Sequence, residues 1–279
     1  MLQLIEAVCE PGAVANEDIW GEGGGAAWIM DGATGVSSRR HLPGASDAAW
    51  FVGQSHIALG RHFAAGGSLD EIFQAVVEEV AVAARATCDI EAMAPHERPS
   101  ASLAAIRASE QGLELANLGD CTLLWRTVGG KACRFGSSAV AALDGRLHAR
   151  IAQDLSEGKS IEQARLAAGD LARHHRTLMN RPDGYWIFDI SGDGVAHIQT
   201  ETVVVTDAVE VLLMTDGFYR LVDTYGRYGD DELFDAAAYR GLSALYGELR
   251  AIEADDMDCR TYLRGKSRDD ATAVMLRAS

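Results

Sequence analysis

The sequence AAWIMDG, residues 26–32, decides the fold class, because it is an apolar run that ends in an acidic residue followed by glycine. A short continuous apolar run of this kind is typical of a buried strand. The run VEVLLMTDG, residues 209–217, repeats the pattern, and the apolar segment 271–276 directly follows Asp269 and Asp270. The sequence therefore predicts buried strands that carry carboxylates at their ends.

The segments around these strands predict an α+β arrangement. Helical periodicity is expected over 46–63 and from Ser68, where Ser68 and Glu71 form a capping box, and these two helices should form a hairpin on one face of a sheet. Further helices are expected over 160–179, 232–239 and 242–254, and further strands over 101–107, 113–118, 122–127, 186–190, 196–199 and 202–205. Regular alternation of strand and helix is absent, so antiparallel sheets with outer helices are favoured over a doubly wound parallel sheet.

The amino-acid composition argues against several classes of binding partner. The 279 residues carry a net charge of −16, from 25 basic and 41 acidic residues, which argues against a nucleic-acid partner. The five cysteines form no CxxC pair, which argues against a disulfide framework or a zinc site and favours a cytoplasmic location. The N-terminus lacks a basic signal-peptide region, and no apolar run reaches the ~18 residues of a membrane span, so no membrane partner is expected.

Acidic residues recur in four places, at Glu17-Asp18, Asp31-Gly32, Asp216-Gly217 and Asp269-Asp270. Converging carboxylates repel one another unless a cation neutralises them, and an oxygen-rich ligand set suits Mg²⁺ or Mn²⁺. Because the chain is acidic, bound metal would also supply the positive charge that a phosphate ester needs. Asp-Gly is equally a common turn sequence, which is the interpretation we give to residues 144–145, 183–184 and 193–194.

Five ordered motifs extend this pattern over nearly the whole chain: Asn16-Glu17-Asp18, Asp31-Gly32-Ala33-Thr34-Gly35, Asn117-Leu118-Gly119-Asp120-Cys121, Thr215-Asp216-Gly217, and Asp269-Asp270-Ala271-Thr272. Together they resemble the signatures of the PP2C (PPM) metal-dependent serine/threonine protein phosphatases of bacterial type. The resemblance implies one phosphatase domain over residues 1–279. It also implies a four-layer αββα sandwich, in which two antiparallel sheets are flanked by helices.

The resemblance further implies a site that holds two Mn²⁺ or Mg²⁺ ions. Asp31 would bridge the ions, and Asp216 and Asp269 would complete the catalytic set. The other metal-site residues would be Glu17, Asp18, the Gly32 carbonyl and Asp270, with the choice between Asp269 and Asp270 as direct ligand left open. Asp120 would be structural or contact a third, weaker ion. A hydroxide between the two ions would attack phosphoserine or phosphothreonine monoesters of a phosphorylated protein.

The chain departs from the family pattern where the substrate phosphate would bind. Ala13 stands where the family usually has an arginine, and Arg39 or Arg40 is the candidate replacement. Ala33 stands where some members have a histidine, and Thr34 replaces a glycine. Two alternatives to a protein phosphatase therefore stay open: a weak or inactive pseudophosphatase acting as a binding module, and a phosphatase of small phosphorylated metabolites. The sequence does not indicate an oligomeric state.

Overall fold

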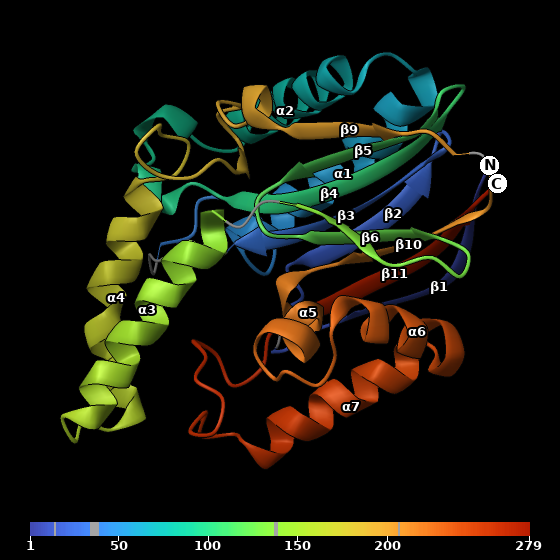
Figure 1. Ribbon diagram of the computed structural model, residues 1–279. Helices are drawn as coiled ribbons and strands as arrows, with labels where there is room; N and C mark the ends of the chain where they lie inside the picture. The colour runs from blue at the N-terminus through green and yellow to red at the C-terminus, as the bar shows by residue number, and fades with distance from the viewer. Residues whose placement is uncertain (14, 34–38, 137–138, 206) are drawn as a thin grey trace.

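Two antiparallel sheets form the centre of the molecule in the computed structural model, which describes residues 1–13, 15–33, 39–136, 139–205 and 207–279 (Figure 1). The first sheet has the strand order β1 (Leu2–Glu10), β11 (Ala271–Ala278), β10 (Val209–Met214), β6 (Thr122–Thr127), β7 (Cys133–Phe135). The second has the order β2 (Asp18–Gly23), β3 (Ala26–Ala33), β4 (Ser100–Ser109), β5 (Gly112–Leu118), β9 (Gln199–Val203), and β8 (Phe188–Asp189) also pairs with β4.

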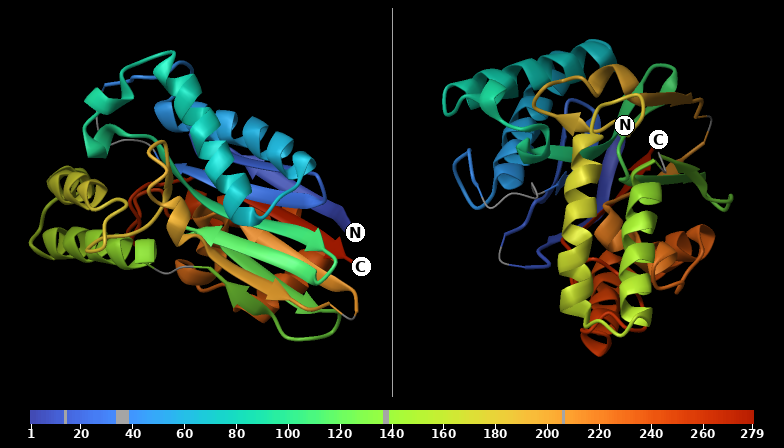
Figure 2. Two further views of the ribbon diagram at one scale, coloured as in Figure 1. Left: turned by 90° about the horizontal axis from the view of Figure 1, so that it is seen from above. Right: turned by 90° about the vertical axis from the view of Figure 1, so that its left-hand side faces the viewer.

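Helices cover the outer face of each sheet, so the predicted αββα sandwich is confirmed (Figure 1). The second sheet is covered by α1 (Asp47–Ala65) and α2 (Leu69–Arg85), and the first by α5 (Asp216–Asp223), α6 (Asp230–Arg240) and α7 (Leu242–Asp255). A further pair, α3 (Ala139–Ser156) and α4 (Ile161–Thr177), packs side by side and projects from the sandwich (Figure 2). We call this pair the arm. Short 3₁₀ turns lie at Ile90–Ala92, Pro95–Glu97 and Val195–His197.

Alternating side chains build the layers, as the period of a strand requires. In β3, Trp28 and Met30 pack against α1 and α2, whereas Ala27 and Ile29 pack between the sheets. In β10, Leu212 and Met214 face α5 to α7, whereas the neighbouring Val211 and Leu213 face the other sheet. Both strands are therefore apolar on both faces, which explains why each is a continuous apolar run.

The structure confirms some of the local expectations and corrects others. The α1–α2 hairpin is confirmed, with capping boxes at Ser68 and at Ser160, the N-cap of α4. The turn expected at residues 144–145 is wrong, because both residues lie within α3. The strand expected at 196–199 is wrong over most of its length, because the Val195–His197 turn precedes β9. No helix in the described ranges is long and apolar enough to cross a membrane.

The start of α5 gives a prediction about stability. A Cβ atom added to Gly217 would lie 1.9 Å from the Asp270 carbonyl oxygen, so either α5 or the start of β11 would have to move. Gly217→Ala should lower the free energy of unfolding by about 1–3 kcal/mol, as overpacking does. The control is Gly247→Ala in α7, which meets open space and should gain up to about 1 kcal/mol. Urea unfolding measures both, and equal stability of the two variants would contradict this packing.

Candidate functional site

Strand pairing brings the predicted acidic residues to one edge of the sandwich. In antiparallel neighbours the end of one strand lies beside the start of the next, and Asp31, near the end of β3, pairs with Asp18 at the start of β2. In the other sheet Met214, at the end of β10, pairs with Ala273 near the start of β11, which places Asp216 beside Asp269. The four acidic positions predicted from sequence therefore meet although they are far apart in the chain.

A cleft of about 700 Å³ opens at this edge, between the sandwich and the arm. The three carboxylates that the sequence predicts to be catalytic all line it: Asp31, Asp216 and Asp269. Gly32, Asp120 and Asp223 also line the cleft. Glu17, Asp18 and Asp270 are not part of this lining, so they lie behind the cleft surface.

The fold holds Asp31 and Asp18 close together although their carboxylates repel each other when ionised. Burial raises the pKa of Asp31 well above its ordinary value, and the charges of Asp18 and Asp216 raise it further. Burial also raises the pKa of Asp18, while the Thr215 hydroxyl, which donates to Asp18 Oδ2 at 2.8 Å, lowers it in part. Such a cluster is costly to ionise and would be stabilised by a cation.

Asp269 differs from Asp31 because two cations already hold it. Arg220 Nη2 donates to Asp269 Oδ2 at 2.5 Å, and Lys266 Nζ donates to Oδ1 at 2.8 Å. Neither cation was foreseen from sequence, although Arg220 follows Asp216 by four residues, a spacing that places both on one face of a helix.

Asp270 has a different environment from its neighbour. Its Oδ1 accepts from the backbone N–H of Gly12, and its Oδ2 accepts from that of Glu17, both at 2.7 Å. It ties the β1–β2 connection to the start of β11. The two adjacent acids thus separate into one that faces the cleft and one that fixes the backbone.

Glu17 and Gly32 form a tight backbone contact behind the cleft. Glu17 is 8% exposed, and its carbonyl accepts the Gly32 N–H at 3.0 Å. A Cβ atom on Gly32 would lie 2.6 Å from that same carbonyl oxygen, so this position requires glycine. The glycine of the Asp31-Gly32 motif therefore serves close approach of two strands.

Asp120 contacts the second sheet at the cleft edge. The Ser102 hydroxyl donates to Asp120 Oδ1 at 2.5 Å, and the Asp120 N–H donates to the same hydroxyl oxygen at 3.2 Å. This pair joins β4 to the β5–β6 turn.

The two arginines predicted to bind phosphate do not line the cleft. Arg39 and Arg40 are both exposed, and Arg40 donates to the carbonyls of Gly44 and Ala45 at 2.7 and 3.0 Å. Ala33 does line the cleft, whereas Thr34 and Gly35 of the motif lie outside the described residues. The cleft takes its positive charge from other positions, namely Arg134, Arg176, Arg220, Arg264 and Lys266.

The arm supplies the opposite wall of the cleft. Leu143 belongs to a small apolar cluster with Tyr185 and Ile187, and all three line the cleft. His148 of α3 also lines it, where burial and the charge of Arg220 lower its pKa and the charge of Asp216 raises it. Arg176 of α4 donates to the Ala33 carbonyl at 3.3 Å and so connects the arm to the strand that carries Asp31.

The chemistry of the donor set fits a divalent metal in part. Within the described ranges, no cluster of three or more His, Cys, Asp or Glu side chains is arranged to hold a metal. Asp31 and Asp216 nevertheless offer carboxylates at an open cleft, and no described side chain forms an ion pair or hydrogen bond with either. These are ligands that Mg²⁺ and Mn²⁺ prefer. Asp269 would fit only after exchange of its present cations.

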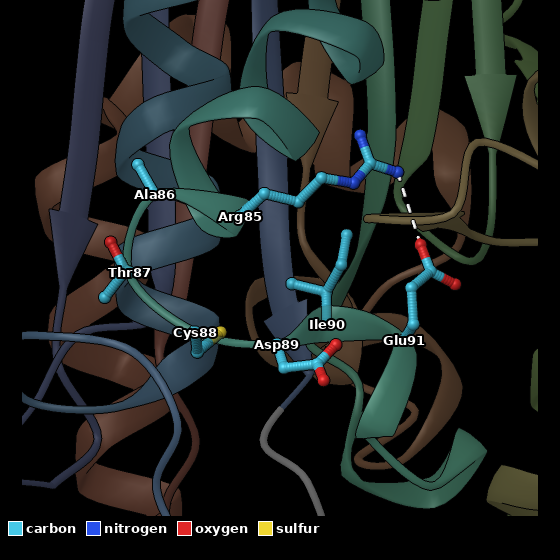
Figure 3. A pocket seen from close by; sticks show the side chains of 7 residues that line it. All are labelled: Arg85, Ala86, Thr87, Cys88, Asp89, Ile90 and Glu91. Carbon is cyan, nitrogen blue, oxygen red and sulfur yellow. Dashed lines mark hydrogen bonds and ion pairs between the residues drawn. The ribbon is translucent and has the colours of Figure 1, made fainter.

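A second hollow lies at the C-terminal end of α2 (Figure 3). It has a volume of about 510 Å³, and its lining consists of Arg85, Ala86, Thr87, Cys88, Asp89, Ile90 and Glu91. Arg85 and Glu91 form an exposed ion pair across it at 3.4 Å. None of the predicted site residues belongs to it, so the carboxylate cleft remains the candidate site.

Known structures resemble this chain over its whole length. The PPM Ser-Thr phosphatase MsPP from Mycobacterium smegmatis, solved with cacodylate, is 15% identical with a TM-score of 0.55, and the match covers 98% of each chain. PppA of Pseudomonas aeruginosa is 16% identical with a TM-score of 0.57, covering 100% of this chain and 98% of that one. The PstP catalytic domain, solved with two manganese ions, is 19% identical with a TM-score of 0.53, covering 99% and 97%.

The chain has the fold of the bacterial PPM serine/threonine phosphatases. No family model matches the sequence. No curated protein matches it at a significant level either. At these identities the likeness extends to the fold, and the activity has to be argued from the residues of the cleft.

The carboxylate cluster predicts an unusual dependence of stability on pH. Because the pKa of Asp31 is raised above its ordinary 3.8, the folded protein binds more protons than the unfolded chain between those two values. The ionised carboxylate therefore costs stability as pH rises through this window, and the full cost persists at neutral pH. In chelator, Asp31→Asn should raise the melting temperature at pH 7, and this gain should shrink as pH falls to about 3.8.

Asp256→Asn is the control of opposite sign. The backbone N–H groups of Thr261 and Tyr262 and the Arg264 guanidinium outweigh desolvation and lower the pKa of Asp256 to about 2. This variant should be destabilised at pH 7, and the loss should disappear as pH falls toward 2. Thermal unfolding from pH 2 to 8 measures both variants. An Asp31→Asn variant less stable than wild type at pH 7 would contradict the description of the cluster.

Proposed function

We propose that this protein is a metal-dependent phosphatase that hydrolyses phosphoserine and phosphothreonine monoesters of a phosphorylated protein. The observation that carries the proposal is the convergence of Asp31, Asp216 and Asp269, from both sheets, on one cleft in this fold. Mn²⁺ or Mg²⁺ ions bound there would neutralise phosphoryl charge and lower the pKa of a water molecule. The cytoplasm is the proposed compartment.

The residues of the chain have distinct roles in this proposal. Asp31 and Asp216 would hold metal directly, and Asp269 would join them once released from its cations. Asp18, whose Oδ2 accepts from the Thr215 hydroxyl, is paired with Asp31 across β2 and β3, and a bound cation would favour its ionised form. Arg176 positions the segment after Asp31 by binding the Ala33 carbonyl and the Ser100 hydroxyl.

The cleft also suggests how a substrate would lie. Asp31, Asp216, Asp269 and Arg220 occupy the sandwich side, whereas Leu143, Tyr185 and Ile187 form an apolar surface on the opposite side. A phosphoryl group would bind on the polar side. The chain around the phosphorylated residue would contact the apolar side and bury apolar area there.

A second candidate function has two observations in its favour. Asp269 is already neutralised by Arg220 and Lys266, and Ala13 leaves the usual phosphate-binding position without charge. These features favour a catalytically weak pseudophosphatase that binds phosphorylated partners. A phosphatase of small phosphorylated metabolites is the further alternative, and it would use the same carboxylates.

Hydrolysis of an aryl phosphate tests the activity. Wild type should turn over with Mn²⁺ and stop when chelator is added. Asp216→Asn should lose a factor of about 100 or more, because a charged group at the reacting centre is removed. Asp170→Asn, at an exposed position of α4, is the control and should retain full activity. An inert wild type with Mn²⁺ would favour the pseudophosphatase, and an active Asp216→Asn would refute the proposed site.

A substrate panel then separates the two enzyme hypotheses. Phosphopeptides with apolar residues beside phosphoserine or phosphothreonine should give a kcat/KM about tenfold or more above that of small phosphate esters, because the apolar wall adds about 1.4 kcal/mol or more of binding. Replacing Leu143 by Ser should reduce this preference while leaving aryl phosphate hydrolysis unchanged. Equal rates for peptides and small esters would instead favour a metabolite phosphatase.

A further inference from the structure

Asp269 is enclosed by positive charge in a way that Asp31 and Asp216 are not. Both of its carboxylate oxygens are engaged, Oδ2 by Arg220 at 2.5 Å and Oδ1 by Lys266 at 2.8 Å. In the described part of the chain, no lysine or arginine forms an ion pair with Asp31 or Asp216. The cleft thus contains two carboxylates available to a metal and one that a pair of cations occupies.

Arg220 is fixed in this position by a second carboxylate. Its Nη1 lies 3.8 Å from Oε1 of Glu253, which is 1% exposed, and Glu253 Oε2 accepts from Arg250 Nη1 at 2.6 Å. Arg250 Nη2 in turn donates to the Asp269 carbonyl at 2.8 Å. The four residues form a row of alternating charge from α7 to the cleft. Within this row Arg220 Nη1 is buried and has no hydrogen-bond partner among the described residues.

Arg220 remains charged in this environment. A guanidinium stays protonated in proteins, and the two side chains that pair with it here, Asp269 and Glu253, are both acidic. The guanidinium therefore contributes a permanent positive charge to the same region in which a metal would have to bind. A like charge within a few ångströms opposes the binding of a cation.

We propose that Arg220 is an internal counter-cation that competes with a divalent metal for Asp269. The inference rests on the proposed function in one respect, because it takes Asp269 as a residue that would hold a metal. The carboxylate oxygens that accept from Arg220 and Lys266 are the same lone pairs that a metal would use. An ion at Asp269 must displace these contacts, whereas an ion held by Asp31 and Asp216 need not. The chain should therefore bind its metal ions with unequal affinity.

Titration of metal-free protein with Mn²⁺ by calorimetry tests this competition. Arg220→Met should tighten the weaker Mn²⁺ site by roughly tenfold or more, because a neighbouring charge of like sign is removed. Arg220→Lys keeps the charge and should stay close to wild type. Adding Asp269→Asn to Arg220→Met should abolish the gain, because the gain depends on that carboxylate.

Arg126→Met is the matched control. Arg126 is a buried arginine of β6 that pairs with Glu210 and Asp235 away from the cleft, so its loss should leave the affinity for Mn²⁺ unchanged. Should Arg220→Met fail to fold, Lys266→Met measures the same competition, because that side chain is 65% exposed and its removal spares the core. The expected tightening for Lys266→Met is smaller, roughly threefold.

The inference is overturned if a folded Arg220→Met binds Mn²⁺ with unchanged or weaker affinity. If Arg220→Met does not fold, unchanged Mn²⁺ affinity in Lys266→Met overturns it. The absence of Mn²⁺ binding in every variant overturns it as well. Aryl phosphate hydrolysis by wild type is a separate readout. Tightening without any hydrolysis would support the counter-cation and refute the phosphatase. Hydrolysis without tighter Mn²⁺ binding in the variant would support the phosphatase and refute the counter-cation.

Discussion

The repulsion among carboxylates gathered at one edge of two sheets is the constraint on which the rest of the site depends. Asp18 and Asp31 are paired across β2 and β3, and burial together with their neighbours' charges raises the pKa of both. The core between the sheets consists mainly of Ala, Val, Ile and Leu. It positions Asp18 and Asp31 at this edge, but its described residues include no cation that could neutralise them. The stability of this edge therefore has to come from elsewhere, either from bound ions or from cations of the chain itself.

Contacts that do not involve the side chains of Asp31 and Asp216 hold the backbone at this edge. Asp270 accepts two backbone N–H groups, Gly32 brings β3 against the Glu17 carbonyl, and Gly217 allows α5 to begin against the Asp270 carbonyl. Each contact joins segments that are distant in sequence. Fixing the strand ends in this way allows Asp31 and Asp216 to face the cleft without making hydrogen bonds of their own to described residues.

The parts of the structure that sequence could predict are those with a local signal. Continuous apolar runs identified β3 and β10 because both of their faces are buried, and the Ser68–Glu71 capping box located the start of α2. Helix α3 was missed altogether. The Asp144-Gly145 pair suggested a turn, whereas Leu143, Leu147 and Ile151, spaced four apart, favour a helix. In the structure that apolar spacing prevails, since Ile151 packs against Ala164 and Ala168 of α4.

No local sequence signal identifies the residues that contact the acidic side chains of the site. These contacts change how strongly the acidic motif indicates a metal site. Sequence could not separate Asp269 from Asp270, because the difference arises from Gly12 and Glu17 at the other end of the chain. Nor could it reveal that α7 carries Glu253 to hold Arg220 against Asp269. An acidic motif shows how many carboxylates a segment carries, but it does not show which cations of the folded chain contact them. A carboxylate whose two oxygens already accept from cations is electrostatically closer to a neutral residue, so motifs of equal charge can differ in their demand for metal.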